Sequence, residues 1–287
     1  MSTILCAGET LWDVLPGGEF IGGAPFNVAG HGSRLGAHAL LATRLGNDAR
    51  GRRALAAVKA LGIDSSLVQI DPLLPTGEAR AVLDASGSAR YEFLSPAAWD
   101  ALEVTPPLLA AAASCDAFVY GTLAQRDRRS RDTIARLAAA ARWRVFDPNL
   151  RDPHIERTLC EAGLTGAGLV KINEDECRVF ADWFGGGVSP DSQWMTLRAR
   201  FGIGALCVTL GAAGSRLCWQ ERWYEQAAVP TQVADTVGAG DSSLAMLVCA
   251  LLAGDDPQVS LARAARLASF VASQPGAVPT YQAAHFS

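Results

Sequence analysis

The 287-residue sequence lacks the features that mark membrane and nucleic-acid-binding proteins. It contains no uncharged apolar run of about 18 residues, and no basic region followed by an apolar stretch opens the chain. The formal net charge is −4, and the densest basic stretch, Arg126–Arg131, is interrupted by Asp and Ser. Because nucleic acid binding needs a concentrated positive surface, we expect no nucleic acid or membrane partner and predict a cytoplasmic protein. We place Arg126–Arg131 at the solvated start of a helix.

Several common catalytic and metal-binding motifs are also missing. Neither a G-x-x-x-x-G-K-[ST] loop nor a G-x-S-x-G motif occurs, which disfavours P-loop and α/β-hydrolase chemistry. The seven cysteines are widely spaced, form no C-x-x-C pair and mostly lie in apolar runs, so we expect buried free thiols. The four histidines share no spacing and have no acidic partner at a fixed offset, so we assign them no catalytic role.

What the sequence does contain is a regular alternation of two kinds of segment. Short apolar runs alternate with Ala-rich amphipathic stretches, which is the pattern of βαβ units. We predict strands at Ser2–Ala7, Ala39–Thr43, Ala117–Tyr120, Arg144–Asp147, Gly168–Ile172 and Ala205–Thr209, and helices at Phe26–Leu35, Gly51–Leu61 and Ser130–Ala141. The sequence therefore predicts an α/β fold with a mostly parallel sheet.

Two segments depart from this alternation and are typical of hairpins. Residues 79–84 and 89–94 flank the turn residues 85–88, and residues 10–14 return through 19–23 after a Pro-Gly-Gly turn. Together they predict a small β-lid with elements at approximately 10–22 and 75–97. Since no internal repeat or low-complexity linker is present, we treat residues 1–287 as one domain.

The segment from Asp235 to Ser243, D-T-V-G-A-G-D-S-S, is the strongest candidate for chemistry. It runs into an apolar stretch, predicted as a helix over Leu244–Ala253, which places its glycines at a helix N-terminus. Free amides and the helix dipole bind anions there, and glycine allows close approach. A carboxylate at Asp241 would repel such an anion but would suit a base that takes a proton from an attacking hydroxyl. The alternative is that Asp241 caps the helix and the glycines form a turn.

This nine-residue string resembles the second signature of the PfkB family of sugar kinases, which includes ribokinase and fructokinase. The resemblance implies that Asp241 is the base and that the amides of Gly238, Ala239 and Gly240 form the anion hole. It also implies a monovalent cation such as K+ near Asp235, for which a structural role at the helix entry is the alternative.

The stretch Ile21–Gly36 resembles the family's first signature, which lines the sugar site. Gly22 and Gly23 would let a polyol approach the backbone, and the Asn27 amide can both donate to and accept from hydroxyls. Upstream, Asp13 resembles the family's sugar-binding aspartate, and Phe93 is our candidate for a sugar contact from the lid. The alternatives are a turn before a helix cap for the glycines and a surface position for Asp13.

A D-x-N-x-R motif follows the strand predicted at Arg144–Asp147. If extended, Asp147, Asn149 and Arg151 would project to one side at the carboxyl end of a parallel strand, where α/β proteins bind ligands. In the resembling family this motif lies near the junction of sugar and phosphate, which implies that Asn149 binds sugar and Arg151 steadies the γ-phosphate. A structural turn with an Asp–Arg pair is the alternative.

Two further stretches match the family's nucleotide side. Asn173 and Glu176 match an N-x-x-E motif that positions Mg²⁺ and phosphates, Glu176 largely through water. An acidic first helical turn, favoured by the helix dipole, is the alternative. The loop containing Thr209, Gly211 and Gly214 resembles the loop near the ATP phosphates and ribose.

The resemblance covers the chain from Gly8 to Gly276 and implies a ribokinase-like three-layer α/β/α core with a β-lid. It implies an ATP- and Mg²⁺-dependent kinase acting on a primary hydroxyl of a small sugar, with bacterial fructokinases as the most similar type. Alternatives are a kinase for ribose, 2-keto-3-deoxygluconate or a nucleoside, and a sugar-binding regulator without catalysis. Exposed lid strands favour a homodimer. Residues 265–269 depart from the family pattern near the adenine and leave the base preference open.

Overall fold

The central feature of the fold is a large twisted sheet that is parallel over most of its width. The computed structural model describes residues 1–15, 17–83, 89–185 and 189–286. Within these residues eight strands form the sheet in the order β14-β13-β12-β11-β10-β9-β1-β4, in which the pairings of β12 with β13 and of β13 with β14 are antiparallel and the others are parallel. The strands are β1 (Thr3–Ala7), β4 (His38–Ala42), β9 (Ala117–Tyr120), β10 (Arg144–Phe146), β11 (Leu169–Asn173), β12 (Ala205–Thr209), β13 (Ser215–Trp219) and β14 (Arg222–Gln226).

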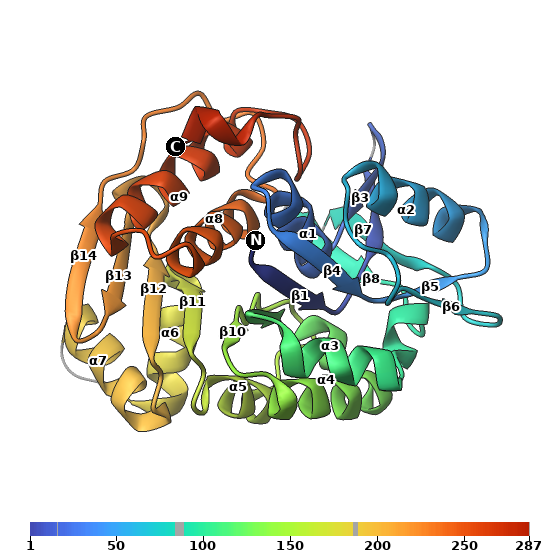
Figure 1. Cartoon of the computed structure of the whole chain (residues 1–287), viewed down its shortest axis with the longest axis horizontal. Helices are drawn as coiled ribbons and strands as arrows, with labels where there is room; N and C mark the ends of the chain where they lie inside the picture. Colours follow the sequence, from blue (N-terminus) through green and yellow to red (C-terminus); the bar gives the residue numbers. More distant parts are fainter. Residues whose placement is uncertain (16, 84–88, 186–188, 287) are drawn as a thin grey trace.

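Helices cover both faces of this sheet because its strands are apolar on both sides. In β1, Ile4 and Cys6 belong to one core, while Leu5 and Ala7 belong to the other. Figure 1 shows one set of helices on the first face and another set on the second. The first set is α1 (Ala24–Arg34), α8 (Ala239–Leu252) and α9 (Pro257–Ala272); the second is α3 (Pro106–Ser114), α4 (Arg128–Ala140), α5 (Arg157–Leu164), α6 (Glu174–Phe184) and α7 (Pro190–Phe201).

A second, smaller sheet is formed by the two predicted hairpins. Its order is β3-β2-β7-β8, with β2 (Leu11–Leu15) parallel to β7 (Gly77–Leu83) and antiparallel to β3 (Gly18–Gly22), and β7 antiparallel to β8 (Ala89–Phe93). The predicted turn at 85–88 lies outside the described residues. Beside this sheet lie α2 (Ala49–Ala60) and the short pair β5 (Arg44–Gly46) and β6 (Gln69–Asp71) (Figure 1). The predicted α/β class with a parallel core and a small β-lid is confirmed.

The site lies where the chain changes direction across the sheet. From β1 the chain first pairs on one side with β4 and later returns to pair on the other side with β9. Loops leaving the carboxyl ends of strands on the two sides of such a point diverge and leave a crevice for ligands. Glu9 and Asp13 follow β1, and Gly121 follows β9.

Two local predictions were right only in part. Residues 126–131 do lie at the start of a helix, α4, and Arg128 and Arg129 are exposed. Arg126 is not solvated, because its guanidinium packs over the Trp99 ring at 3.9 Å and donates to both oxygens of buried Asp100 at 2.8 Å. Helix α8 begins at Ala239 rather than at Leu244, because the polar residues that precede the apolar run are buried within its first turn.

All seven cysteines are free, as expected. In the described part of the chain, no helix combines the length and apolarity needed to cross a membrane.

Candidate active site

The first turn of α8 presents unpaired amides at the edge of the crevice. Gly238 is the N-cap residue with φ 79°, and a Cβ there would lie 2.5 Å from the carbonyl oxygen of Ala277, so only glycine fits. Within the described residues, the amides of Gly240 and Asp241 donate to no acceptor, whereas the Ala239 amide makes a long 3.3 Å bond to Thr236. Two free amides at the positive end of a helix can hold an anion.

Asp241 is the third residue of this helix, and its side chain caps no amide. Its side chain instead accepts a 2.8 Å hydrogen bond from Nδ2 of Asn27 on α1. Burial raises the pKa of Asp241, and the charge of Asp147 raises it further, while the Asn27 bond and the charges of Lys171 and Arg151 lower it. Asp241 is 9% exposed, and the alternative of a helix-capping aspartate does not hold.

Asp13 and Phe93 lie on the same face of the lid sheet. Asp13 is in register with Ala79, and Ala79 with Phe93, so all three side chains project to one side. A Cβ on Gly22 would lie 2.5 Å from Oδ2 of Asp13, so glycine keeps this carboxylate accessible. Burial raises the pKa of Asp13 to about 6, and Arg151 opposes that rise. Phe93 contacts the His154 ring edge-on, with ring centroids 6.1 Å apart.

A second buried carboxyl, that of Glu9, lies near enough to Asp241 for the two charges to interact. Its Oε1 accepts a 3.2 Å hydrogen bond from the amide of Ala24 at the start of α1, beside Gly23. Burial raises the pKa of Glu9 to about 7, and the charge of Asp241 contributes. A small cavity beneath the crevice is lined by residues that include Glu9, Tyr120, Asp147, Asn149 and Leu244.

The D-x-N-x-R motif does not project to one side, contrary to our prediction. Asn149 adopts a left-handed conformation with φ 44°, which turns the chain between Asp147 and Arg151. Asp147 points inward and accepts a 2.8 Å bond from Nζ of Lys171, so the predicted alternative of an Asp–Arg pair does not form. Arg151 is exposed and forms no hydrogen bond or ion pair with the described residues, yet its charge lowers the pKa values of Glu9, Asp13 and Asp241.

The N-x-x-E motif forms a capping box at the start of α6. Oδ1 of Asn173 accepts a 2.9 Å hydrogen bond from the Glu176 amide, and Oε2 of Glu176 accepts a 2.8 Å hydrogen bond from the Asn173 amide. The other carboxylate oxygen of Glu176 accepts from the Leu150 amide at 2.9 Å. Glu176 is 3% exposed, and the described residues hold no cluster of three or more metal-binding side chains. Glu176 therefore fits a hydrated ion contacted through water better than direct coordination.

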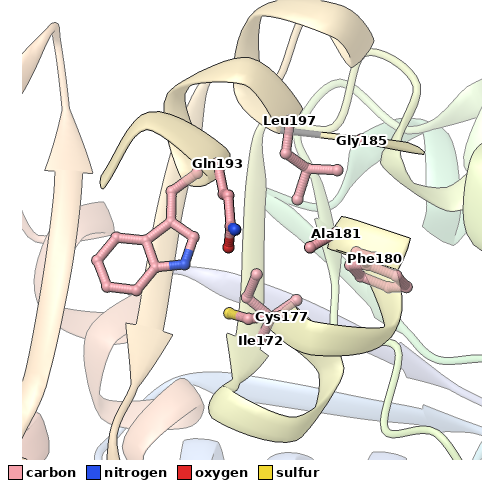
Figure 2. Close-up of a pocket in the computed structure, with 8 residues that line it drawn as sticks. Ile172, Cys177, Phe180, Ala181, Gly185, Gln193 and Leu197 are labelled. Carbon is pink, nitrogen blue, oxygen red and sulfur yellow. The ribbon is translucent and has the colours of Figure 1, made fainter. Parts of the chain in front are cut away.

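The remaining predicted positions lie along the same edge. Thr209 is in register with Asn173 at the end of β12, and Gly211 and Gly214, with φ 54° and 100°, turn the chain into β13. Asp235 accepts from the Val237 amide at 3.0 Å, which is the structural role foreseen as an alternative at the helix entry. A further small cavity lies between α6 and α7, where Figure 2 shows the apolar side chains of Phe180 and Leu197.

Three residues of the site were missed from the sequence. Lys171 interrupts the apolar strand β11, and a charge in a strand buried on both faces needs a partner, which was a usable signal. Tyr91 lies two residues before Phe93 on β8, and its pKa, raised first by burial, also responds to the charges of Asp13 and Arg151. No local pattern distinguished Glu9 from an ordinary loop carboxylate.

Comparison with known proteins places the chain in a family. The model described as pfkB family carbohydrate kinase matches residues 6–284. A fructokinase of Klebsiella pneumoniae is 29% identical over 274 residues, which cover 91% of this chain and 88% of that protein. A 2-dehydro-3-deoxygluconokinase of Thermoproteus tenax is 26% identical over 264 residues, covering 85% and 76%.

Solved structures show the same fold. A fructokinase from Vibrio cholerae O395, in a form with fructose, ADP and calcium ion bound, matches with a TM-score of 0.80 at 24% identity, covering 97% of this chain and 95% of that one. Together with the family match, this similarity identifies the core as ribokinase-like. The chain belongs to the pfkB family of carbohydrate kinases.

Proposed function

We propose that the protein transfers the γ-phosphate of ATP to a primary hydroxyl of a small neutral sugar, fructose, with Asp241 as the base. The observation that carries this proposal is the position of Asp241. Its carboxylate is buried, bonded to Asn27 and placed in the same helical turn as two unpaired amides. A proton acceptor and an anion site are thereby joined in one turn, which in-line phosphoryl transfer requires.

In this mechanism the chain mainly positions the reactants and balances charge. Asp241 accepts the proton of the attacking hydroxyl, while the unpaired amides of Gly240 and Asp241 and the guanidinium of Arg151 stabilise the charge of the transferring group. Gly238 and Gly240 allow the phosphoryl group to approach this turn closely. Asp13 and Asn27 orient the sugar through hydrogen bonds, and the lid sheet excludes water. Glu176 beside Asn173 would hold Mg²⁺ through water, and the ion would supply positive charge to the ATP phosphates. Thr209, Gly211 and Gly214 would lie along the nucleotide.

The charge of the acceptor side favours a neutral sugar. Three carboxyl groups lie on the acceptor side, those of Glu9, Asp13 and Asp241. The charge of Arg151 lowers the pKa of each of them, and the charge of Asp241 raises the pKa of Glu9. An anionic acceptor would add charge to a region already rich in carboxylates. The fructokinase of Klebsiella pneumoniae, similar over most of both chains, supports fructose as the first acceptor to test.

A second candidate is a sugar acid such as 2-keto-3-deoxygluconate. The similar protein of Thermoproteus tenax carries that activity in its name. The guanidinium of Arg151 has no ion-pair partner among the described residues, so a substrate carboxylate could take that place. Under this alternative Arg151 would recognise the acceptor instead of the phosphate.

The deciding experiment measures ADP release from ATP and Mg²⁺ with fructose, ribose, adenosine and 2-keto-3-deoxygluconate. We expect fructose to give the highest kcat/KM, and the Asp241→Asn variant to give no acceptor-dependent release above background. A preference for 2-keto-3-deoxygluconate would select the second candidate. If no acceptor elicits ADP but one raises the melting temperature, the protein is a sugar-binding regulator and the kinase proposal fails.

Three related proposals concern organisation. We propose that residues 1–287 act as one domain, since the core elements α1 and β4 lie in sequence between the lid strands β2 and β3 and the lid strands β7 and β8. A monovalent cation near Asp235 would increase turnover without changing the fold.

Association of two chains through the lid is favoured by Phe20 on β3, which is 44% exposed at the open edge of the small sheet. Sedimentation of the Phe20→Ser variant against the unchanged chain tests this association.

A further inference from the structure

A buried lysine lies directly beneath the first turn of α8. Lys171 projects from β11 and is 7% exposed. Its Nζ donates a 2.8 Å hydrogen bond to Oδ2 of Asp147, which follows the neighbouring strand β10 (Figure 1). A Cβ built on Gly240 would lie 3.1 Å from the same Nζ. The ammonium group therefore lies between the end of β10 and the turn that carries Asp241.

Three buried carboxyl groups surround this one ammonium. Although burial disfavours the charge of Lys171, the carboxylates of Asp147 and Glu176 raise its pKa, and Asp241 adds to the effect, so it stays protonated. Asp147 and Lys171 act on Asp241 in opposite directions, since Asp147 raises its pKa and Lys171 lowers it. Oδ1 of Asp147 is buried without a hydrogen-bond partner in the described structure, so Lys171 is the group that neutralises this carboxylate.

The other polar and titratable groups around Asp241 cannot replace the lysine. Asn27 on α1 is uncharged, and Arg151 is exposed, so water screens its charge. Glu9, beyond the end of β1, and the thiol of Cys6 on β1 also face Asp241, and neither carries positive charge. The positive charge buried beside the turn is therefore that of Lys171.

We propose that Lys171 is a positioning residue, which neutralises Asp147 and so keeps the carboxylate of Asp241 ionised and held against the α8 turn. The role in catalysis rests on the proposed use of Asp241 as the base. The electrostatic coupling itself does not depend on which acceptor is used, and it can be measured without any reaction.

The direct test is a carboxyl ¹³C NMR titration of protein labelled at aspartate Cγ, with the Asp241 signal assigned by its absence in Asp241→Asn. We expect the Asp241 midpoint to rise by about one pH unit in Lys171→Met and to fall by a similar amount in Asp147→Asn. The double variant should lie between the two. An unchanged midpoint in Lys171→Met, or shifts of the same sign in both single variants, would overturn the proposal. If Lys171→Met does not fold, the sign of the shift in Asp147→Asn decides.

Kinetics then separates this proposal from the proposed function. If the unaltered protein phosphorylates a sugar, Lys171→Met should lose about tenfold in kcat/KM at pH values below the Asp241 midpoint and recover most of it at high pH. An equal loss at every pH would mean a merely structural lysine and would refute the positioning role. If the unaltered protein shows no acceptor-dependent ADP release, the proposed function fails, while the titration still decides the coupling.

Discussion

Nδ2 of Asn27 donates a 2.8 Å hydrogen bond to Oδ2 of Asp241, and so joins residues 214 positions apart in the sequence. The bond connects the first turns of α1 and α8, the two helices that begin at the crevice. Oδ1 of Asn27 is buried and has no partner within the described residues, so it remains available to accept from a hydroxyl. One amide can thus contact both the proposed base and the proposed acceptor.

Replacing Asp241 by Asn should abolish proton acceptance and keep the shape of the site. We expect kcat to fall roughly 10²- to 10⁴-fold, because general-base catalysis contributes on that scale. Sugar binding, measured by calorimetry, should be retained. Asp182→Asn, at an exposed position of α6 to which no role is assigned, is the control and should keep most of the activity. Undiminished turnover in Asp241→Asn would rule out this residue as the base.

Replacing Asn27 by Leu removes the hydrogen bond that lowers the pKa of Asp241. That pKa should rise, so the acid limb of the kcat/KM profile should move up by about one pH unit, and activity should recover at higher pH. The measurement is a pH profile at saturating ATP. If the KM for the sugar rises but the acid limb of the kcat/KM pH profile does not move, Asn27 contacts only the acceptor.

The arrangement of strands and helices was predictable from the sequence because the spacing of apolar residues differs between the strands and the helices. The positions of single side chains were less so. The D-x-N-x-R motif has the spacing of an extended strand, but Asn149 reverses the chain with a positive φ that nothing in the string required. Arg126 looked solvated within a charged stretch, yet Asp100 and Trp99, distant in sequence, enclose it. Partners supplied by other elements decide such cases, as they do for Lys171.

The proposed acceptor contact of Asp13 predicts a particular pH dependence. Because burial raises the pKa of Asp13 to about 6, protonation below that pH removes an ionised acceptor of sugar hydrogen bonds. KM for the sugar should therefore rise as pH falls through 6, while KM for ATP stays constant. Asp13→Asn should raise the sugar KM roughly 10- to 100-fold and flatten this dependence. A sugar KM in Asp13→Asn that still rises below pH 6 would assign the effect to another group.

A variant of Glu176 can separate its structural role in the fold from a role in holding Mg²⁺. Its two oxygens accept from the amides of Leu150 and Asn173, so Glu176→Ala leaves both partly buried hydrogen bonds unmade. We expect about 1–3 kcal/mol less stability in urea unfolding without added Mg²⁺. Glu174→Ala, in the same helical turn but exposed, should change stability little. Equal stability of both variants would indicate that Glu176 acts only once a metal is bound.

Replacing Glu9 by Gln should stabilise the folded protein, because it removes a buried charge from the site. The pKa of Glu9 is about 7 in the folded protein against an ordinary 4.5, so its contribution is fully present below pH 4.5 and is lost as pH rises through 7. Glu9→Gln retains an oxygen for the amide of Ala24 and removes the buried charge. At about pH 8 the variant should be more stable by up to about 3 kcal/mol, with the difference shrinking toward pH 5. Urea unfolding at the two pH values measures this, with exposed Glu174→Gln as the control. A Glu9→Gln variant less stable than the unaltered protein at pH 8 would mean that the charged carboxylate is compensated, and Arg151 would be the group to examine next.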